Sequence, residues 1–331
     1  MSERDGVVMK GTGGVYQVRA DDGELFDVSL RGRLKHDSGR EGKRDPERET
    51  MRRVGRLDGA ERPLKLAVGD RVMISSDESE TSWAIDVIYP RRSKLARRAP
   101  GGARGERVVI ANLDQVIVVF AAAKPEPHPR MLDRFLVIAE ANGLAARIVI
   151  NKCELAAERD IRKRFHEFVD AGYPLHLTSV VAGIGLEALR AEVGGRNSAL
   201  TGPSGVGKSS LMNTLFPGLD LRTAEISESV NKGRHTTVGA VMHPLPGGGF
   251  VADTPGLREV GLWGIDVAGL GNCFPELRPL LDGCRFAECT HLVEPGCAIR
   301  DAVADGRVNR GRYESYIKLR EELAESNQNS W

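Results

Sequence analysis

The sequence has few aromatic residues and no long apolar segment. Phe, Trp and Tyr make up 5% of its 331 residues, and the longest apolar run extends only from Val116 to Ala123. A membrane-spanning helix needs about 20 consecutive apolar residues, so none is predicted. The first residues are polar and lack the apolar centre of a secretory signal. We therefore expect a cytoplasmic protein without a membrane partner.

Cysteine is also scarce, and its number is odd. Five cysteines do not suit a disulfide framework, and three of them lie close to a histidine near the C-terminus, which favours a metal site. The net charge of +1 conceals two basic stretches, residues 31–53 and 91–107. Any contact with nucleic acid is expected to begin there.

The pattern of the chain changes twice, and its length suits two or three domains. Residues 1–96 contain about five short β-rich runs, which predict a small barrel such as an OB-fold. Residues 97–106 are expected to form a linker, and residues 107–262 alternate strands and helices as an α/β domain does. Residues 263–331 combine a Cys-rich segment with helices expected near 298–304 and 308–325.

The strongest motif is a glycine-rich loop where a strand meets a helix. It matches the G-x-x-x-x-G-K-[ST] pattern, in which backbone N–H groups cradle phosphates, the Lys reaches the β- and γ-phosphates and the Ser binds Mg²⁺. An ordinary Gly-rich turn is the alternative. The loop, called the phosphate loop below, follows Thr201 and consists of Gly202, Pro203, Ser204, Gly205, Val206, Gly207, Lys208 and Ser209.

Two earlier loops predict which base is bound. Asn151, Lys152, Cys153 and Glu154 follow a buried strand as the guanine-reading N-K-x-D sequence does, although they could also form a helix N-cap. The end of the next strand carries Thr178, Ser179 and Val180, in the place of the loop whose backbone contacts the guanine oxygen. We call these the guanine motif and the second base loop, and together they favour GTP and GDP as ligands.

Two segments after the phosphate loop complete the set. Asp253 to Gly256 ends an apolar strand in D-x-x-G, whose Asp supports Mg²⁺ through water and whose Gly amide senses the γ-phosphate, although Asp-Thr-Pro-Gly also suits a β-turn. His235, Thr236 and Thr237 lie between the phosphate loop and Asp253, in a polar segment suited to a switch loop. Either Thr could coordinate Mg²⁺.

A fourth constellation predicts a metal. Three thiols and one imidazole at short spacing can close a tetrahedral Zn²⁺ site, and the surrounding acidic and Gly residues give little reason to bury free cysteines. The four residues are Cys284, Cys289, His291 and Cys297.

The order of these motifs behind a barrel resembles the RsgA (YjeQ/YloQ) family, the small-subunit-dependent GTPases with a circularly permuted G domain. The resemblance extends over nearly the whole chain and includes the phrases at 233–237, 273–276 and 294–297. It implies an OB-fold, a permuted G domain and a C-terminal zinc-binding domain. It further implies late maturation of the small (30S) ribosomal subunit, with GTP hydrolysis stimulated by that subunit, and we expect a monomer.

Several roles depend on that resemblance or leave alternatives. His235 is a candidate for positioning water, although a solvated loop histidine is as good an interpretation, and Leu257 stands where many GTPases have the water-orienting Gln. Glu154, longer than the usual Asp, leaves an ATPase as a weak alternative; a nucleic-acid-binding protein shaped by nucleotide is another. The residues expected to contact rRNA phosphates are Arg31, Arg33, Lys35, Arg52, Arg53 and the basic run from Arg91 to Arg98.

Overall fold

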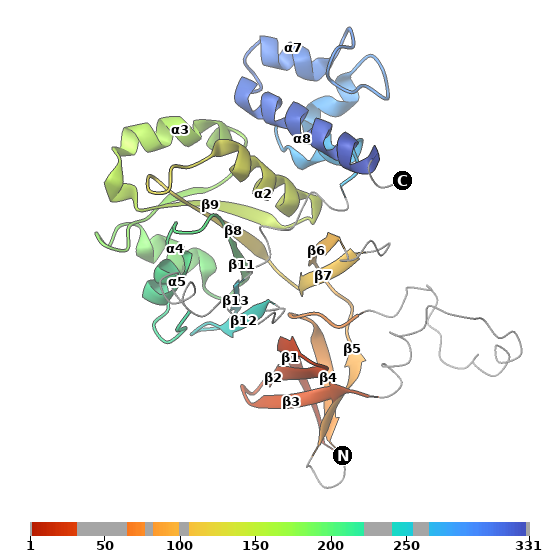
Figure 1. The fold of residues 1–331 in the computed structure, drawn as a ribbon, viewed down its shortest axis with the longest axis vertical. Helices are drawn as coiled ribbons and strands as arrows, with labels where there is room; N and C mark the ends of the chain where they lie inside the picture. Colours follow the sequence, from red (N-terminus) through yellow and green to blue (C-terminus); the bar gives the residue numbers. More distant parts are fainter. Residues whose placement is uncertain are drawn as a thin grey trace, which may run out of the picture. The chain divides into compact units, whose positions relative to one another are not determined.

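The computed structural model describes residues 2–31, 65–76, 82–98, 106–221, 240–253 and 265–328. The chain forms two compact units, Met1–Arg91 and Arg92–Trp331 (Figure 1).

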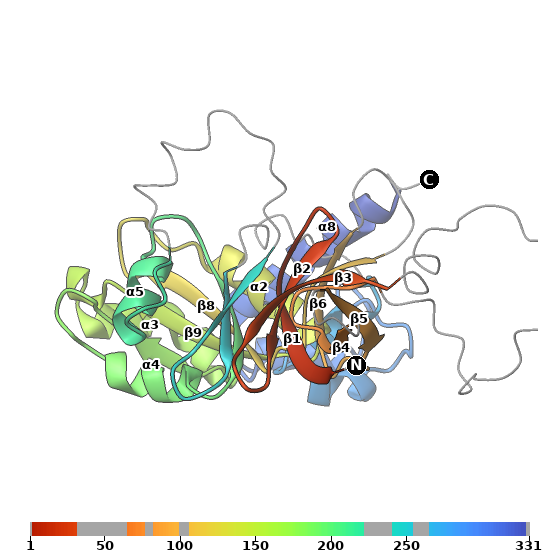
Figure 2. The same ribbon diagram turned by 90° about the horizontal axis from the view of Figure 1, so that it is seen from below.

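The first unit is a closed five-stranded barrel. Its strands occur in the order β1-β2-β3-β5-β4, and only the β3–β5 pair is parallel. Figure 2 shows the strands of the barrel curving around one another. The core that they enclose consists of Val8, Val18, Val28, Val72, Ile74 and Ile85. Their bounds are Glu3–Thr12, Val15–Ala20, Leu25–Leu30, Arg71–Ser76 and Trp83–Ile88 for β1 to β5. The predicted barrel is confirmed.

The second unit is built on a six-stranded sheet of order β10-β9-β8-β11-β13-β12. All neighbours are parallel except β12 and β13. Every residue of β8 is buried, as expected of a central strand covered on both faces. The bounds are Gln115–Ala121 (β8), Ala145–Asn151 (β9), Leu175–Leu177 (β10), Asn197–Thr201 (β11), Val241–Pro244 (β12) and Phe250–Asp253 (β13).

Helices cover both faces of this sheet (Figure 1). Helix α2 (Pro129–Ala141) packs against β8 and β9, where the ring of Phe135 meets that of Phe120. The opposite face packs against α4 (Leu186–Val193) and α5 (Lys208–Leu215) through their leucine side chains. Helix α3 (Glu158–Asp170) buries Ile161, Phe165 and Phe168. The predicted α/β pattern is confirmed, whereas α4 and β12 were not expected.

A short hairpin lies where a linker was expected. Strands β6 (Lys94–Arg98) and β7 (Glu106–Ala111) pair antiparallel, and both belong to the second unit. The division between the units therefore follows Arg91, before the expected boundary at residue 96, and strands occupy both ends of segment 97–106. Local composition indicated a linker because the Gly-, Pro- and Arg-rich residues between the two strands obscure the short apolar runs on either side.

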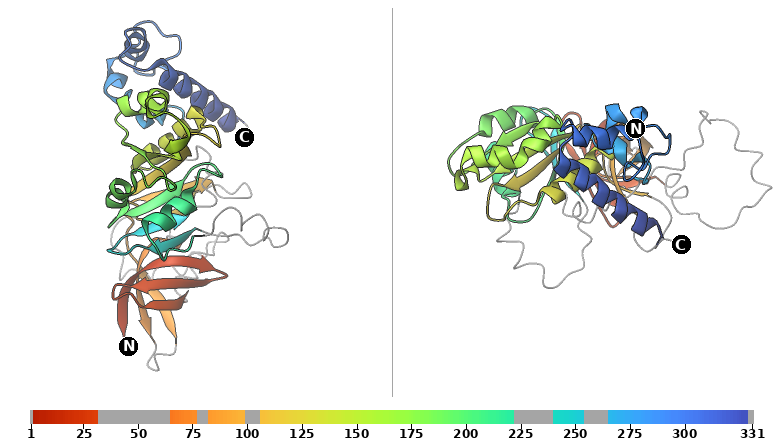
Figure 3. Two further views of the ribbon diagram at one scale, coloured as in Figure 1. Left: turned by 90° about the vertical axis from the view of Figure 1, so that its left-hand side faces the viewer. Right: turned by 90° about the horizontal axis from the view of Figure 1, so that it is seen from above.

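The C-terminal module, residues 265–328, is helical. It contains the 3₁₀ turns η5 (Gly269–Cys273) and η6 (Arg278–Gly283), followed by α7 (Ala298–Ala304) and α8 (Arg310–Gln328). The long helix α8 lies beside α2 (Figure 3). None of the helices in the described ranges combines the length and apolar character needed to cross a bilayer.

Candidate nucleotide and metal sites

The motifs predicted to bind nucleotide meet at one edge of the sheet. The guanine motif begins at the last residue of β9, the second base loop follows β10, and the phosphate loop follows β11. Because these strands are parallel, their carboxyl ends lie together, which is where open α/β sheets bind ligands. Asp253 ends β13 at the same edge.

The phosphate loop bends at three glycines whose backbone conformations other residues rarely adopt. Gly202, Gly205 and Gly207 all have positive φ, at 133°, 76° and 90°. A Cβ on Gly202 would lie 2.0 Å from the Val119 carbonyl oxygen, and one on Gly207 would lie 2.6 Å from Nδ2 of Asn151. The loop therefore lies against both β8 and the guanine motif and turns directly into α5.

Lys208 occupies the first position of α5, and its ammonium group points back into the loop. Its Nζ donates to the carbonyls of Gly202 at 2.9 Å and Pro203 at 2.7 Å. Ser209 follows in the first helical turn and is half-buried. This arrangement places a cation and a hydroxyl where the loop converges, as phosphate and Mg²⁺ binding require.

The guanine motif is hydrogen-bonded directly to the phosphate loop. Asn151 is 2% exposed, and its Nδ2 donates to the Val206 carbonyl at 2.9 Å. The buried hydroxyl of Thr178 donates to Oδ1 of Asn151 at 3.2 Å. One side chain thus joins the loops after three different strands.

Lys152 makes a second link. Its backbone is left-handed, with φ of 57°, and its Nζ donates to the carbonyls of Gly205 at 2.6 Å and Lys124 at 2.7 Å. Lys124, in the loop between β8 and α2, is also left-handed, with φ of 50°. Such conformations in bulky residues persist only where the surroundings hold them, and they concentrate at functional sites.

The second base loop is held by its own backbone. Ser179 and Ile184 exchange backbone hydrogen bonds of 3.0 and 3.1 Å, and the Ser179 hydroxyl accepts from the Ala182 amide at 2.9 Å. The amide of Cys153 donates to the Thr178 carbonyl at 3.0 Å and joins this loop to the guanine motif. Val180 is half-buried against the core.

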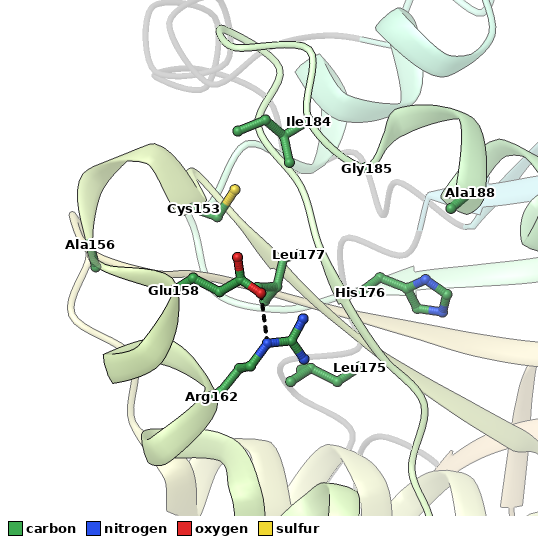
Figure 4. Close-up of a pocket in the computed structure, with 10 residues that line it drawn as sticks. All are labelled: Cys153, Ala156, Glu158, Arg162, Leu175, His176, Leu177, Ile184, Gly185 and Ala188. Carbon is green, nitrogen blue, oxygen red and sulfur yellow. Dashed lines mark hydrogen bonds and ion pairs between the residues drawn. The ribbon is translucent and has the colours of Figure 1, made fainter.

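The thiol of Cys153 lines a pocket beside these loops. The pocket has a volume of about 470 Å³ and extends along β10 between the start of α3 and Gly185 (Figure 4). Burial raises the pKa of the Cys153 thiol. Glu154 is exposed at the surface.

Some predicted residues cannot be placed. His235, Thr236, Thr237 and Gly256 lie outside the described residues, and of Asp253 only the backbone is described. Their expected roles stay predictions.

The Cys and His residues of the C-terminal module converge on one point. Their ligand atoms lie within 4.8 Å of one another. Nδ1 of His291 is 3.5 Å from the Sγ atoms of both Cys284 and Cys297, which are 3.9 Å apart. Tetrahedral zinc with Zn–S of about 2.3 Å and Zn–N of about 2.0 Å requires S···S near 3.8 Å and S···N near 3.5 Å. The four residues therefore fit Zn²⁺.

Hydrogen bonds around the cluster fix its loop. The Glu294 carboxylate accepts from the amides of Thr290, Leu292 and Val293 at 2.9 to 3.1 Å and from the Thr290 hydroxyl. These donors hold the pKa of Glu294 well below its usual range. The Tyr313 hydroxyl donates to the His291 carbonyl at 2.6 Å. Burial lowers the pKa of His291, which favours the neutral imidazole that a metal needs.

Two features of the structure were not anticipated from the sequence. One is the Lys124 carbonyl, for which the local signal was a Lys-Pro pair in the loop that follows a buried strand. The other is the buried ion pair of Arg312 with Asp133, 179 residues apart. No local pattern identifies that pair.

Comparison with known proteins decides the family. A family model described as RsgA GTPase matches residues 88–263. The chain belongs to the RsgA GTPase family. It is therefore a GTP-hydrolysing enzyme with a circularly permuted G domain.

Relatives match along nearly the whole chain. A Gemmatimonas aurantiaca protein named small ribosomal subunit biogenesis GTPase RsgA is 63% identical over 319 residues, which cover 96% of this chain and 97% of the relative. A protein of the same name from Halalkalibacterium halodurans is 35% identical, with 96% of each covered. The crystal structure of YjeQ from Thermotoga maritima matches with a TM-score of 0.76 and 32% identity over 98% of this chain and 99% of that one.

Proposed function

We propose that this RsgA-family GTPase acts in late maturation of the small ribosomal subunit, and that the subunit stimulates its GTP hydrolysis. The hydrogen bond from Asn151 to the Val206 carbonyl carries the nucleotide part of the proposal, because it joins the base-reading and phosphate-binding loops into one site. The names of the relatives support the ribosomal part.

The phosphate loop would bind the β- and γ-phosphates through its backbone amides, and the Lys208 ammonium would stabilise the charge that develops between them. Asn151 and Glu154 would bind the edges of guanine while the stem of Lys152 covers the ring. Bound Mg²⁺ would neutralise phosphate charge, with Ser209, Asp253 and a switch threonine around it.

Intrinsic hydrolysis should be slow, because Leu257 follows the D-x-x-G sequence where other GTPases orient water with Gln. We propose that the subunit orders the switch segment around His235. The attacking water would then be placed correctly only when the switch segment is ordered. Hydrolysis would therefore depend on the bound subunit.

The C-terminal module would hold one structural Zn²⁺ through Cys284, Cys289, His291 and Cys297. Bound zinc would lock the loop before α7 in a single conformation. The C-terminal module would be the third domain, after the barrel and the G domain, of a monomeric cytoplasmic protein.

The barrel is proposed to contact rRNA, with one revision to the expected residues. Arg91 is paired with the fully buried Asp70 at 2.6 Å and has only 9% of its side chain exposed. We therefore assign it to stabilising the barrel and not to contacting RNA. Arg31 is paired with Asp86 at 2.8 Å but is 42% exposed. Arg33, Lys35, Arg52 and Arg53 lie outside the described residues.

GTP hydrolysis measured with and without purified small subunits tests this proposal. We expect slow turnover alone, a rise of at least tenfold with subunits, and no comparable rise with large subunits or with ATP. Subunit binding should weaken steeply with salt, as phosphate contacts require. A rate indifferent to small subunits would refute the ribosomal part and leave the GTPase assignment intact.

A further inference from the structure

A buried charge cluster joins the C-terminal module to the G domain. Arg312 of α8 is 1% exposed. Its Nε donates to Glu276 at 2.6 Å, and its Nη1 donates to the carboxylate of Asp133, which is also 1% exposed. The Ser315 hydroxyl donates to the other oxygen of Asp133.

Aromatic rings enclose the guanidinium on its remaining sides. The centroids of Phe274, Phe168 and Tyr173 lie 4.8, 5.2 and 5.7 Å from its central carbon. Phe274 belongs to the module, whereas the other two come from the end of α3 and the segment that follows it. Arg312 is thus the point at which the module, α2 and α3 are held together.

Asp133 lies in the second turn of α2, nine residues after Lys124 in the sequence. Helix α2 starts at Pro129, immediately after the loop that contains Lys124. The Lys124 carbonyl accepts a hydrogen bond from the Lys152 ammonium group. That group also donates to the carbonyl of Gly205 in the phosphate loop. A change in the position of α2 therefore reaches the lysine that is to cover the guanine ring.

We propose that Arg312 is a positioning residue for guanine nucleotide, acting through Asp133, α2 and the Lys124 carbonyl on Lys152. Arg312 grips Glu276 with Nε and Nη2 and reaches Asp133 of α2 with Nη1. This buried contact defines the position of α2 more sharply than an exposed pair does, because a buried carboxylate that loses its partner is not compensated by water. The C-terminal module consequently sets nucleotide affinity even in the free protein, and a partner that displaces α8 weakens GDP binding.

The proposal depends on the nucleotide site but not on the ribosomal role. Its test is GDP affinity in the full-length zinc-loaded chain, measured by displacement of a fluorescent GDP analogue. Arg312→Met should raise the dissociation constant for GDP by about 2- to 30-fold, the range of coupling along packed networks. Asp133→Asn should also raise the dissociation constant for GDP. In the double variant this constant should rise by less than the product of the two single-variant fold-changes.

Two controls separate positioning from general loosening. Arg134→Met removes the exposed pair with Glu322, which joins the same two helices, and should leave GDP affinity unchanged. Tyr313→Phe removes the hydrogen bond to the His291 carbonyl and weakens the module away from α2. It should lower thermal stability without changing GDP affinity.

The kinetic signature is a rise in KM for GTP with kcat preserved, because Lys208 and the phosphate loop are untouched. Wild-type GDP affinity in Arg312→Met, or an equal loss in Tyr313→Phe, would overturn the proposal. Should Arg312→Met fail to fold, Ser315→Ala and Asp133→Asn decide by the same criteria. Absence of GDP binding in the wild-type chain would instead refute the nucleotide site itself.

Discussion

The Thr178 hydroxyl provides a sharp test of how the guanine site is built. Thr178 is fully buried, and its side-chain hydrogen bond goes to Oδ1 of Asn151 at 3.2 Å. Thr178→Val keeps the shape of the side chain and removes only the donor. Asn151 then keeps its bond to Val206 but loses the partner that fixes the rotation of its amide.

The expected loss follows from one buried neutral hydrogen bond, about 1 kcal/mol, or up to about 3 kcal/mol if the Asn151 oxygen finds no other donor. At about 1.4 kcal/mol per tenfold, the smaller value corresponds to about a fivefold rise in the dissociation constant for GDP. The discrimination against ATP should narrow by a similar factor, because phosphate contacts are unaffected.

The assay is equilibrium displacement of a fluorescent GDP analogue, with ATP as a second competitor. Thr178→Ser is the matched control, because it keeps the hydroxyl and loses a methyl group. It should cost stability at a buried position, about 1 kcal/mol, while GDP affinity stays near wild type. Wild-type affinity and discrimination in Thr178→Val would show that Asn151 is positioned without this bond.

Three further outcomes are expected. Lys208→Ala should lower kcat by about 100-fold or more, and turnover by the pure variant close to wild type would remove Lys208 from the mechanism. About one Zn²⁺ per chain should copurify, with Cys289→Ala losing it and exposing the C-terminal module to protease; an unchanged digestion pattern would contradict a structural site. Glu294→Gln should lower the melting temperature at pH 7, because the depressed pKa of this carboxyl means that its ionised form stabilises the fold. That difference should shrink as pH falls below about 4.3, where Glu294 of the unfolded chain begins to bind a proton while that of the folded chain stays ionised, and an equal difference at every pH would count against this account.

The sequence by itself determined the parts that depend on neighbouring residues. The phosphate loop needs glycines at fixed positions of one short segment, and the metal cluster needs four ligands between residues 284 and 297. The barrel strands and the helices at 298–304 and near 308–325 follow from local periodicity. In each case the residues that predict the feature are the same contiguous residues that form it.

Tertiary structure decided which distant segments meet. The bond between Asn151 and Val206 joins residues 55 apart, and that between Arg312 and Asp133 joins residues 179 apart. Packing also decided that the neighbouring strands β6 and β7 belong to the second unit, which begins after Arg91. The basic sequence around Arg91 predicts an RNA contact, whereas the structure buries this residue with Asp70. Charge and hydrogen-bonding capacity can be read from a sequence, but the partner that satisfies them depends on burial and chain packing, which no local pattern encodes.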